Sequence, residues 1–308
     1  MEKAQRLGLS FLVGLILLIT QTSAAKKTSE GEEKEGFMDS KFMRGATYYS
    51  KKIIQDGAVR IGLNIGASAP FGISDNISPL SYSPNFSPVI AFDREFLLWK
   101  GLFFSTGIRL EYKGMHTKAK VHDFQTNVEI ENEDGSITKN KGKFTGVNST
   151  NVNCAYATLP LDIGWRFNKH YRLRLGAYIS YRITGSFTGS ASDGYMWSDP
   201  EEGSTLSNKL LIEDAQDFDF SKELRSWDWG VEIAGMHRIT DHFFMEAAFA
   251  VGVPKIFVDD FKGVSMEMHH LYGSVSVGYH FLPSFENEGK KKDALPIPPA
   301  TPNGEKKM

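Results

Sequence analysis

Hydrophobic and polar residues alternate with a period of two in eight segments of the chain. In the stretch LFFSTGIRLEY, Leu102–Tyr112, the residues Ile108 and Leu110 share one parity, and Arg109 and Glu111 share the other. A period of two predicts a β-strand with two unlike faces. The same alternation predicts strands at residues 58–68, 87–98, 102–112, 155–167, 171–183, 226–239, 242–253 and 271–281.

The polar parity of these strands is rich in arginine, aspartate and glutamate, whereas lysine is concentrated outside the strands. A soluble β-sandwich would instead carry lysine, threonine and serine on its wet face. Arginine forms bidentate pairs with carboxylates and suits enclosed ion-pair networks better than lysine does. We therefore expect the polar face to line a filled interior and the apolar face to meet lipid. The predicted lumen charge network comprises Arg109, Glu111, Asp162, Arg174, Arg182, Asp228, Glu232 and Glu246.

The connections between the strands are alternately long and short. The short links have the sequences LLWKG, NKH and TDH, and the long links span residues 68–87, 113–153, 186–225 and 254–268. Outer-membrane barrels have tight periplasmic turns and long external loops, and strands of ~10 residues cross a bilayer when tilted. The pattern predicts an all-β fold, an eight-stranded antiparallel up-and-down transmembrane β-barrel with short periplasmic turns and long external loops. Within residues 113–153, alternation around Asp134 and Gly135 predicts an external hairpin.

Aromatic residues near the strand ends fit the girdles that flank a lipid-facing band. Trp99, Trp165, Phe167, Tyr171 and Phe243 lie near the short links, and Tyr112, Trp227 and Trp229 lie near the long links. Together with the connections, they predict a location in the cell outer membrane.

The two ends of the chain differ from the strands. Lys3 and Arg6 precede the apolar run FLVGLILLI, and small residues follow up to Ala24, which is the layout of a signal peptide. We expect a signal peptide at residues 1–24, a charged periplasmic segment at 25–57, the barrel at 58–282 and a Pro/Lys-rich periplasmic tail at 283–308. No later stretch approaches the ~20 consecutive apolar residues that a spanning helix needs.

Composition and motif spacing argue against several kinds of partner and site. The 308 residues carry a net charge of −2, which argues against a nucleic-acid partner. The one cysteine, Cys154, forms no internal disulfide and builds no zinc site alone. His116, His122 and Asp123 match no known spacing of metal ligands. We predict no catalytic residue, no metal site and no cofactor.

Several segments together resemble one protein family. The signal peptide, GLFFSTGIRLEYKG, the strand YATLPLDIGWRF with its Leu-Pro-Leu, and WDWGVEIAGMHRI are similar to the PorT-like outer-membrane β-barrel proteins. The resemblance covers residues 58–281 and implies a small closed barrel in the outer membrane. It also implies a link to type IX protein secretion, which the founding member has, whereas most relatives have no assigned activity.

Three classes of function remain open from the sequence. The leading hypothesis is a non-enzymatic structural or interaction protein that acts through its external loops, with the outer-membrane bilayer and envelope or secretion-apparatus proteins as partners. One alternative is an enzyme that acts on envelope lipids, for which Glu267, His269, His270 and Ser274 cluster near the start of the last strand. The other is a narrow channel. Because the interior of an eight-stranded barrel is just wide enough to be filled by side chains, we expect a plugged lumen.

Overall fold

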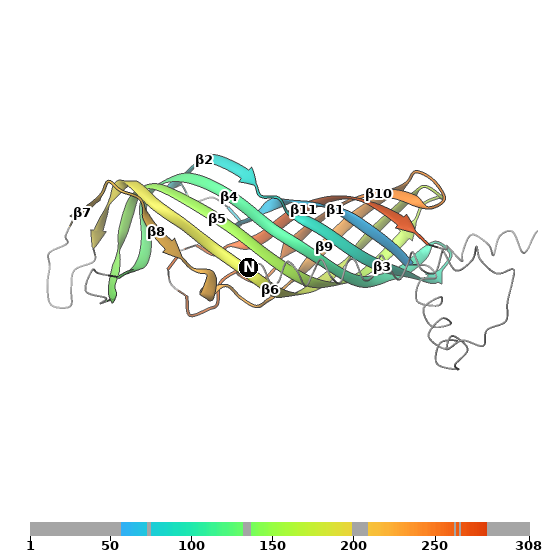
Figure 1. Ribbon diagram of the computed structural model, residues 1–308. Coiled ribbons are helices and arrows are strands. Elements are labelled where there is room, and N and C mark those ends of the chain that lie inside the picture. Colours follow the sequence, from blue (N-terminus) through green and yellow to red (C-terminus); the bar gives the residue numbers. More distant parts are fainter. Residues whose placement is uncertain are drawn as a thin grey trace, which may run out of the picture. The chain divides into compact units, whose positions relative to one another are not determined.

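Eight strands pair in chain order and close into an antiparallel ring in the computed structural model of the protein (Figure 1). The structure describes residues 57–72, 75–131, 137–198, 209–261, 263–264 and 266–281. The ring strands are β1 (Gly57–Ala69), β3 (Pro88–Trp99), β4 (Leu102–Glu131), β5 (Ile137–Arg166), β6 (Tyr171–Ser198), β9 (Trp227–Arg238), β10 (Phe243–Gly252) and β11 (His269–His280). Pairing of β1 with β11 completes the ring, which confirms the predicted eight-stranded barrel.

The two faces of the ring strands differ as the alternation predicts. Ile108 and Leu110 are exposed on the outer face of β4, whereas Arg109 and Glu111 are buried inside the barrel. The exposed apolar residues of the ring include Ile61, Leu63, Leu161, Ile163, Leu175, Ile179, Val231, Ile233, Val275 and Val277. A water-soluble protein would bury such a continuous apolar belt. The exposure of the belt around the ring therefore indicates that it contacts lipid.

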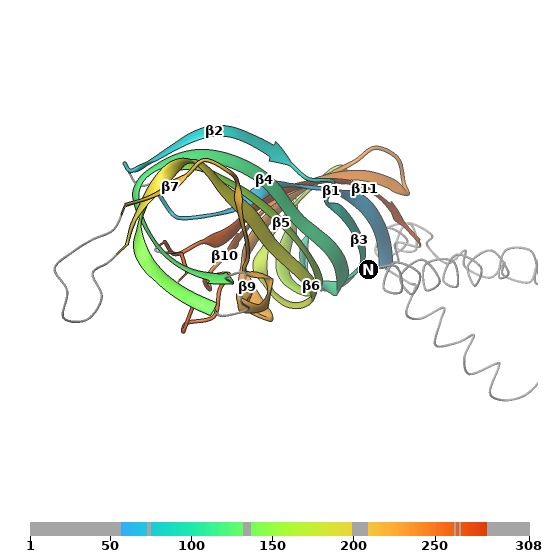
Figure 2. The ribbon, with the colours of Figure 1, turned by 60° about the vertical axis from the view of Figure 1, so that its left-hand side comes forward.

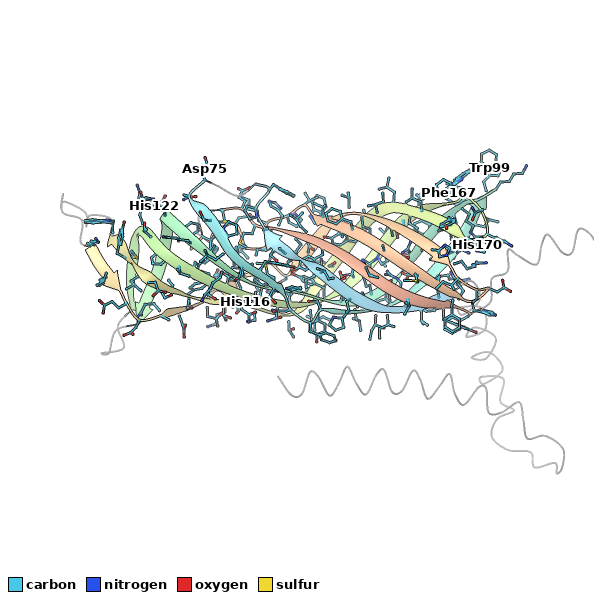
Figure 3. All side chains as sticks on the ribbon, turned by 90° about the horizontal axis from the view of Figure 1, so that it is seen from above. Asp75, Trp99, His116, His122, Phe167 and His170 are labelled. Atoms are coloured by element: carbon cyan, nitrogen blue, oxygen red, sulfur yellow. The ribbon has the colours of Figure 1, made fainter. Side chains whose placement is uncertain are left out.

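Short turns gather at one end of the barrel, where Figure 3 places Trp99, Phe167 and His170. In the turn between β5 and β6, the side-chain oxygen of Asn168 accepts hydrogen bonds from the backbone N–H groups of His170 (2.7 Å) and Tyr171 (2.9 Å). Such side-chain caps let two strands reverse within a few residues. Because tight turns mark the periplasmic side of outer-membrane barrels, the longer connections lie on the external side.

Three ring strands continue well past the lipid-facing belt, which corrects the prediction of a long loop at residues 113–153. The alternation predicted that the third strand ends at Tyr112, but β4 and β5 stay paired through Glu131 and Ile137. β6 likewise extends to Ser198. The predicted hairpin is therefore present as a long β4–β5 pair, and its tip at Asp134 and Gly135 lies outside the described residues.

Shorter strands widen these extensions within the same 11-stranded sheet. β2 (Ile77–Pro84) replaces β3 as the neighbour of β4, and β8 (Gln216–Asp219) and β7 (Lys209–Ile212) replace β9 as neighbours of β6. Figure 2 shows β2 running along the outer part of β4, and Figure 1 shows β7 and β8 at the end of the extensions. We call β2, β7, β8 and residues 113–131, 137–154 and 184–198 the external sheet.

The polarity of β4 inverts where the strand leaves the belt. On its inner face, the buried charge of Arg109 gives way to the buried apolar side chains of Met115 and Val121. On its outer face, exposed Ile108 gives way to exposed Lys118. Lipid favours apolar side chains on the outside, and water favours them on the inside. The inversion therefore marks the passage of the strand from the bilayer into water.

The predicted signal peptide (1–24), nearly all of the predicted periplasmic segment (25–57) and the predicted tail (283–308) lie outside the described residues. Among the residues that are described, no helix is long and apolar enough to cross a membrane. The structure describes one 3-10 turn, η2 (Ser221–Glu223), on the external side.

The substitution Ile108→Arg tests the assignment of the faces. A charge placed near the middle of the lipid-facing belt is expected to lower the free energy of unfolding by about 2–4 kcal/mol. The matched control is Leu98→Arg next to the exposed Trp99 at the turn end, where the same charge is expected to cost about 0–1 kcal/mol. Urea titration of the protein in lipid vesicles measures both values, and an equal loss in the two variants would contradict the assignment.

Candidate functional site

A bidentate ion pair crosses the middle of the barrel. Nη1 and Nη2 of Arg109 each donate a hydrogen bond of 2.8 Å to a carboxylate oxygen of Glu232. Arg109 belongs to β4 and Glu232 to β9, which are not neighbours in the ring. Both side chains are buried, so the pair ties two opposite walls together inside the lumen.

A second chain of ion pairs runs beside the first. Arg174 lies 2.6 Å from Glu246 and 3.5 Å from Asp162. Arg60 lies 3.0 Å from the other oxygen of Glu246 and 2.6 Å from Asp93. These five side chains come from β5, β6, β10, β1 and β3, so Glu246 links five strands through two arginines.

Further pairs extend the network toward both ends of the lumen. Near the turns, Arg166 and Arg172 each lie 2.6 Å from Glu95. Toward the external side, Lys113 lies 3.1 Å from Asp228 and 3.8 Å from Glu111. The carboxylates in these pairs are Asp93, Glu95, Glu111, Asp162, Asp228, Glu232 and Glu246, and the cations are Arg60, Arg109, Lys113, Arg166, Arg172 and Arg174. Opposite charges are therefore nearly balanced inside the barrel.

The eight residues of the predicted network do not all have the same role in the structure. Arg109, Glu111, Asp162, Arg174, Asp228, Glu232 and Glu246 are buried members of the pairs above. Arg182 shares their parity but lies further out along β6, where its guanidinium donates to the carbonyl oxygens of Leu224 (2.7 Å) and Arg225 (3.1 Å). It holds the start of β9 against β6 rather than a carboxylate.

The network also contains Arg60, Asp93, Glu95, Lys113, Arg166 and Arg172, which are outside the predicted set. Lys113 is the one that falls outside the predicted strands. It lies two residues beyond Glu111 on the same parity, and it was excluded because the strand was expected to end at Tyr112. Its ammonium group also lies 4.9 Å from the ring centres of Tyr156 and Tyr178. Two aromatic faces and two carboxylates beside the ammonium group offset the free-energy cost of burying its charge.

A buried histidine lies at the external end of the network. Nδ1 of His270 is 3.0 Å from the Ser68 hydroxyl, and its Nε2 is 2.9 Å from the Tyr156 hydroxyl. The partner proposed from the sequence, Ser274, lies instead beside Asn64 and Ala248 in the strand register. The structure thus gives His270 two hydroxyl partners, neither of which is Ser274.

An apolar layer covers the charged lumen on the external side. The layer consists of Met115, Val152, Cys154, Tyr156, Phe187, Leu224, Ile256, Phe257 and Met268. Ile256, Phe257 and Met268 of this layer belong to the connection between β10 and β11. The backbone N–H of Ile256 donates to the Met268 carbonyl (2.9 Å), and Phe257 forms a β-bridge with Leu224. This segment closes the barrel above the ion pairs.

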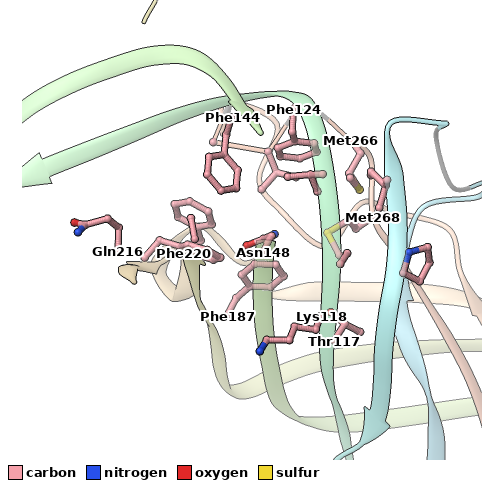
Figure 4. A pocket seen from close by; sticks show the side chains of 18 of the residues that line it. Thr117, Lys118, Phe124, Phe144, Asn148, Phe187, Gln216, Phe220, Met266 and Met268 are labelled. Atoms are coloured by element: carbon pink, nitrogen blue, oxygen red, sulfur yellow. The ribbon is translucent and has the colours of Figure 1, made fainter. Parts of the chain in front are cut away.

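A partly open chamber of about 1000 Å³ lies beyond the apolar layer, on the inner side of the external sheet. Its lining includes Phe124, Phe144, Phe187, Met196, Met266 and Met268, several of which appear in Figure 4. The exposed acidic residues Glu213, Asp214 and Asp217 also line it and therefore lie at its mouth, whereas Lys118 borders it from the outer face of β4. The described residues at the mouth therefore carry a net negative charge.

The end of β8 adds one more fixed negative charge near the mouth. A carboxylate oxygen of Asp219 accepts a hydrogen bond from the backbone N–H of Ser221 (2.8 Å). Hydrogen bonds from the Ser221 hydroxyl and from this N–H hold the pKa of Asp219 below its usual range. Asp219 is therefore ionised at neutral pH, two residues from Asp217.

His122 and Asp123, whose spacing matches no pattern of metal ligands, lie at the surface of the external sheet. Nδ1 of His122 lies 3.6 Å from the carboxylate of Asp123, and both side chains are exposed on the outer surface. In the described part of the chain, no group of three or more histidine, cysteine, aspartate or glutamate side chains is placed to hold a metal ion.

The family model for the outer membrane protein beta-barrel domain matches residues 49–258. The chain belongs to this family. The match covers more than half of the 308 residues and includes the ring from β1 to β10. As an outer membrane protein beta-barrel domain, the ring lies in the cell outer membrane, and its apolar belt contacts the bilayer.

Other comparisons give weaker similarities. No curated protein matches the sequence. Ail, the attachment invasion locus protein of Yersinia pestis, is 11% identical, with 74% of this chain and 99% of Ail covered and a TM-score of 0.31. The toluene transporter TbuX of Ralstonia pickettii is 8% identical, with 73% and 89% covered and a TM-score of 0.20. At these TM-scores, neither similarity bears on the function of this beta-barrel domain.

Removal of Glu232 tests the lumen pair. The Glu232→Ala variant leaves Arg109 buried without its bidentate partner, and we expect it to lower the free energy of unfolding by about 3–5 kcal/mol. The double variant Arg109→Met, Glu232→Leu is expected to recover most of this loss, because a well-packed apolar pair often replaces a buried ion pair without cost. Urea titration in lipid vesicles measures both changes.

A surface pair of the same chain provides the control. Arg225 lies 2.7 Å from Asp259, whose side chain is 76% exposed. We expect Asp259→Ala to change the free energy of unfolding by at most about 1 kcal/mol, because water screens exposed pairs. Similar losses for Glu232→Ala and Asp259→Ala would contradict a structural role of the lumen pair.

Proposed function

We propose that the protein is a non-enzymatic outer-membrane barrel with a closed lumen, which acts through its external sheet. The observation that carries this proposal is the set of ion pairs that fills the barrel. Some of the pairs, such as Arg109 with Glu232, join strands that are not neighbours in the ring, and others join adjacent strands. Ion pairs that connect the strands in this way stabilise the barrel and leave no open path for ions through the lumen.

Conduction would require these pairs to separate. The interior of an eight-stranded barrel is just wide enough to hold its own side chains. Breaking one buried pair costs about 3–5 kcal/mol, because a buried charge is left uncompensated. The apolar layer formed with Phe257 and Met268 adds a second barrier above the charges.

The external sheet offers a surface for a partner along β2. This strand lies at the edge of the described sheet, paired with β4 on one side. Leu80 and Phe86 are exposed on or beside it, and Phe86 is 81% exposed. An edge strand next to exposed apolar side chains is suited to bind another protein by strand addition and apolar contact.

The narrower proposal is membership of the PorT-like proteins, with a role beside the protein-secretion machinery. Its support is the resemblance of the strand YATLPLDIGWRF and of the neighbouring segments to those proteins. The partner on β2 would then be an envelope protein of that machinery. Against the enzymatic alternative stands the arrangement around His270, which lacks the predicted contact with Ser274.

Conductance of the purified protein tests the closed lumen. We expect no stable current steps after insertion into planar lipid bilayers, because the lumen is filled by paired side chains. A known general porin in the same bilayer gives the positive control for insertion and detection. Current steps from the wild-type protein that change in size in the Arg109→Ala variant would overturn this part of the proposal and favour the channel.

Photo-crosslinking in intact cells tests the role of β2. A photoreactive phenylalanine at Leu80 is expected to yield a specific crosslinked product, because this side chain is exposed beside an edge strand. The matched control is the same residue at Lys120, which is exposed on the outer face of β4. Mass spectrometry identifies the partner. Equal crosslinking at both positions, or none at Leu80, would contradict the proposal.

A further inference from the structure

We propose that the chamber inside the external sheet is a binding site for one uncharged hydrophobic molecule that enters from the external side. This site is separate from the proposed interaction surface on β2, because it lies on the inner side of the external sheet. The chamber is built from segments that are far apart in the sequence, which come together only in the folded protein.

The lining favours hydrocarbon. Phe124 and Phe144 lie on the paired extensions of β4 and β5, and Phe187 and Met196 follow along β6. Met266 belongs to the segment that closes the barrel. Aromatic and methionine side chains bury apolar ligands well, and methionine adapts its shape to the ligand.

The volume suits one small molecule. At about 1000 Å³, the chamber lies at the upper end of the range of about 300–1000 Å³ in which small-molecule pockets fall. An apolar molecule that enters the chamber removes its own surface and part of the apolar lining from water, which favours binding.

The mouth selects against negative charge. Among the described residues that line the chamber, Glu213, Asp214 and Asp217 are exposed acidic side chains, whereas the one cation, Lys118, lies on the outer face of β4. A carboxylate or phosphate head group at the mouth would meet like charges, whereas an uncharged head group would not. The mouth therefore disfavours a fatty acid or an anionic lipid, and the apolar lining favours an uncharged molecule, because a charged group loses its hydration there.

The floor of the chamber indicates that the molecule is held rather than passed through the barrel. Phe187, Met115 and Met268 line the chamber and also belong to the apolar layer above the lumen. Below this layer, Lys113 and Asp228 begin the charged network. A hydrophobic molecule has no continuous apolar path through those charges.

Protection of an introduced thiol tests the site on the full-length protein in lipid nanodiscs. The Met196→Cys variant places a thiol in the chamber wall, and N-ethylmaleimide labels it. We expect 1-decanol to slow this labelling at least tenfold and decanoate to slow it much less. Peptide mass spectrometry separates the signal from the native Cys154, which is buried. Lys120→Cys on the outer face is the control, and decanol should leave its labelling unchanged.

A matched pair of substitutions tests whether protection comes from the chamber. Ala191→Phe fills space in the chamber wall, whereas Ala177→Phe adds the same ring to the exposed face of β6. In the Met196→Cys background, Ala191→Phe is expected to abolish protection by decanol and Ala177→Phe to preserve it. Ala119→Phe, on another wall of the chamber, serves as a second filling variant, and heat-modified migration on gels reports folding.

The outcomes separate the alternatives. No protection by decanol in the folded Met196→Cys variant overturns the site, and equal protection by decanoate overturns the selection at the mouth. Slow labelling in nanodiscs without decanol, but fast labelling in detergent, means that a lipid tail fills the chamber and overturns entry from the external side. None of these results depends on conductance or on crosslinking at Leu80, so the site and the proposed function fail independently.

Discussion

The barrel depends on opposite charges that meet across its interior. Arg109 and Glu232 join walls that are not neighbours, and Glu246 holds both Arg60 and Arg174. A buried guanidinium is tolerated only while its carboxylate is in place, so each pair fixes the separation of two strands. β4, β5 and β6 run without interruption from the lumen into water, so the ion pairs in the lumen also fix the positions of these strands in the external sheet. The ring thereby positions the walls of the chamber.

The ring could be predicted from the sequence because parity determines the side of a strand on which a residue lies. That rule places Arg109 and Glu246 in the lumen without any further information. It does not give the depth of a residue in the barrel, which explains why Arg182 differs from the rest of the predicted set. Arg182 has the inward parity, but at its level the loop carbonyls of Leu224 and Arg225 take the place of carboxylates.

The external sheet and the chamber were harder to predict for two physical reasons. The alternation continues past Tyr112 with its polarity reversed, so the segment no longer resembles a lipid-facing strand although it remains a strand. The chamber also depends on contacts between distant parts of the chain. His270 meets Ser68 across 202 positions, and Met266 meets the extensions of β4 to β6. No local pattern carries that information.

The pairing of the first and last ring strands has a consequence for biogenesis. β1 and β11 are in register from Ala58 opposite His280 to Ala69 opposite His269. The loop that this seam closes spans almost the whole barrel, so its contacts are among the slowest to form. Until β11 arrives, both β1 and β10 present open edges that attract other strands. A chain that ends before β11 would therefore leave an unsealed, aggregation-prone sheet instead of a smaller barrel.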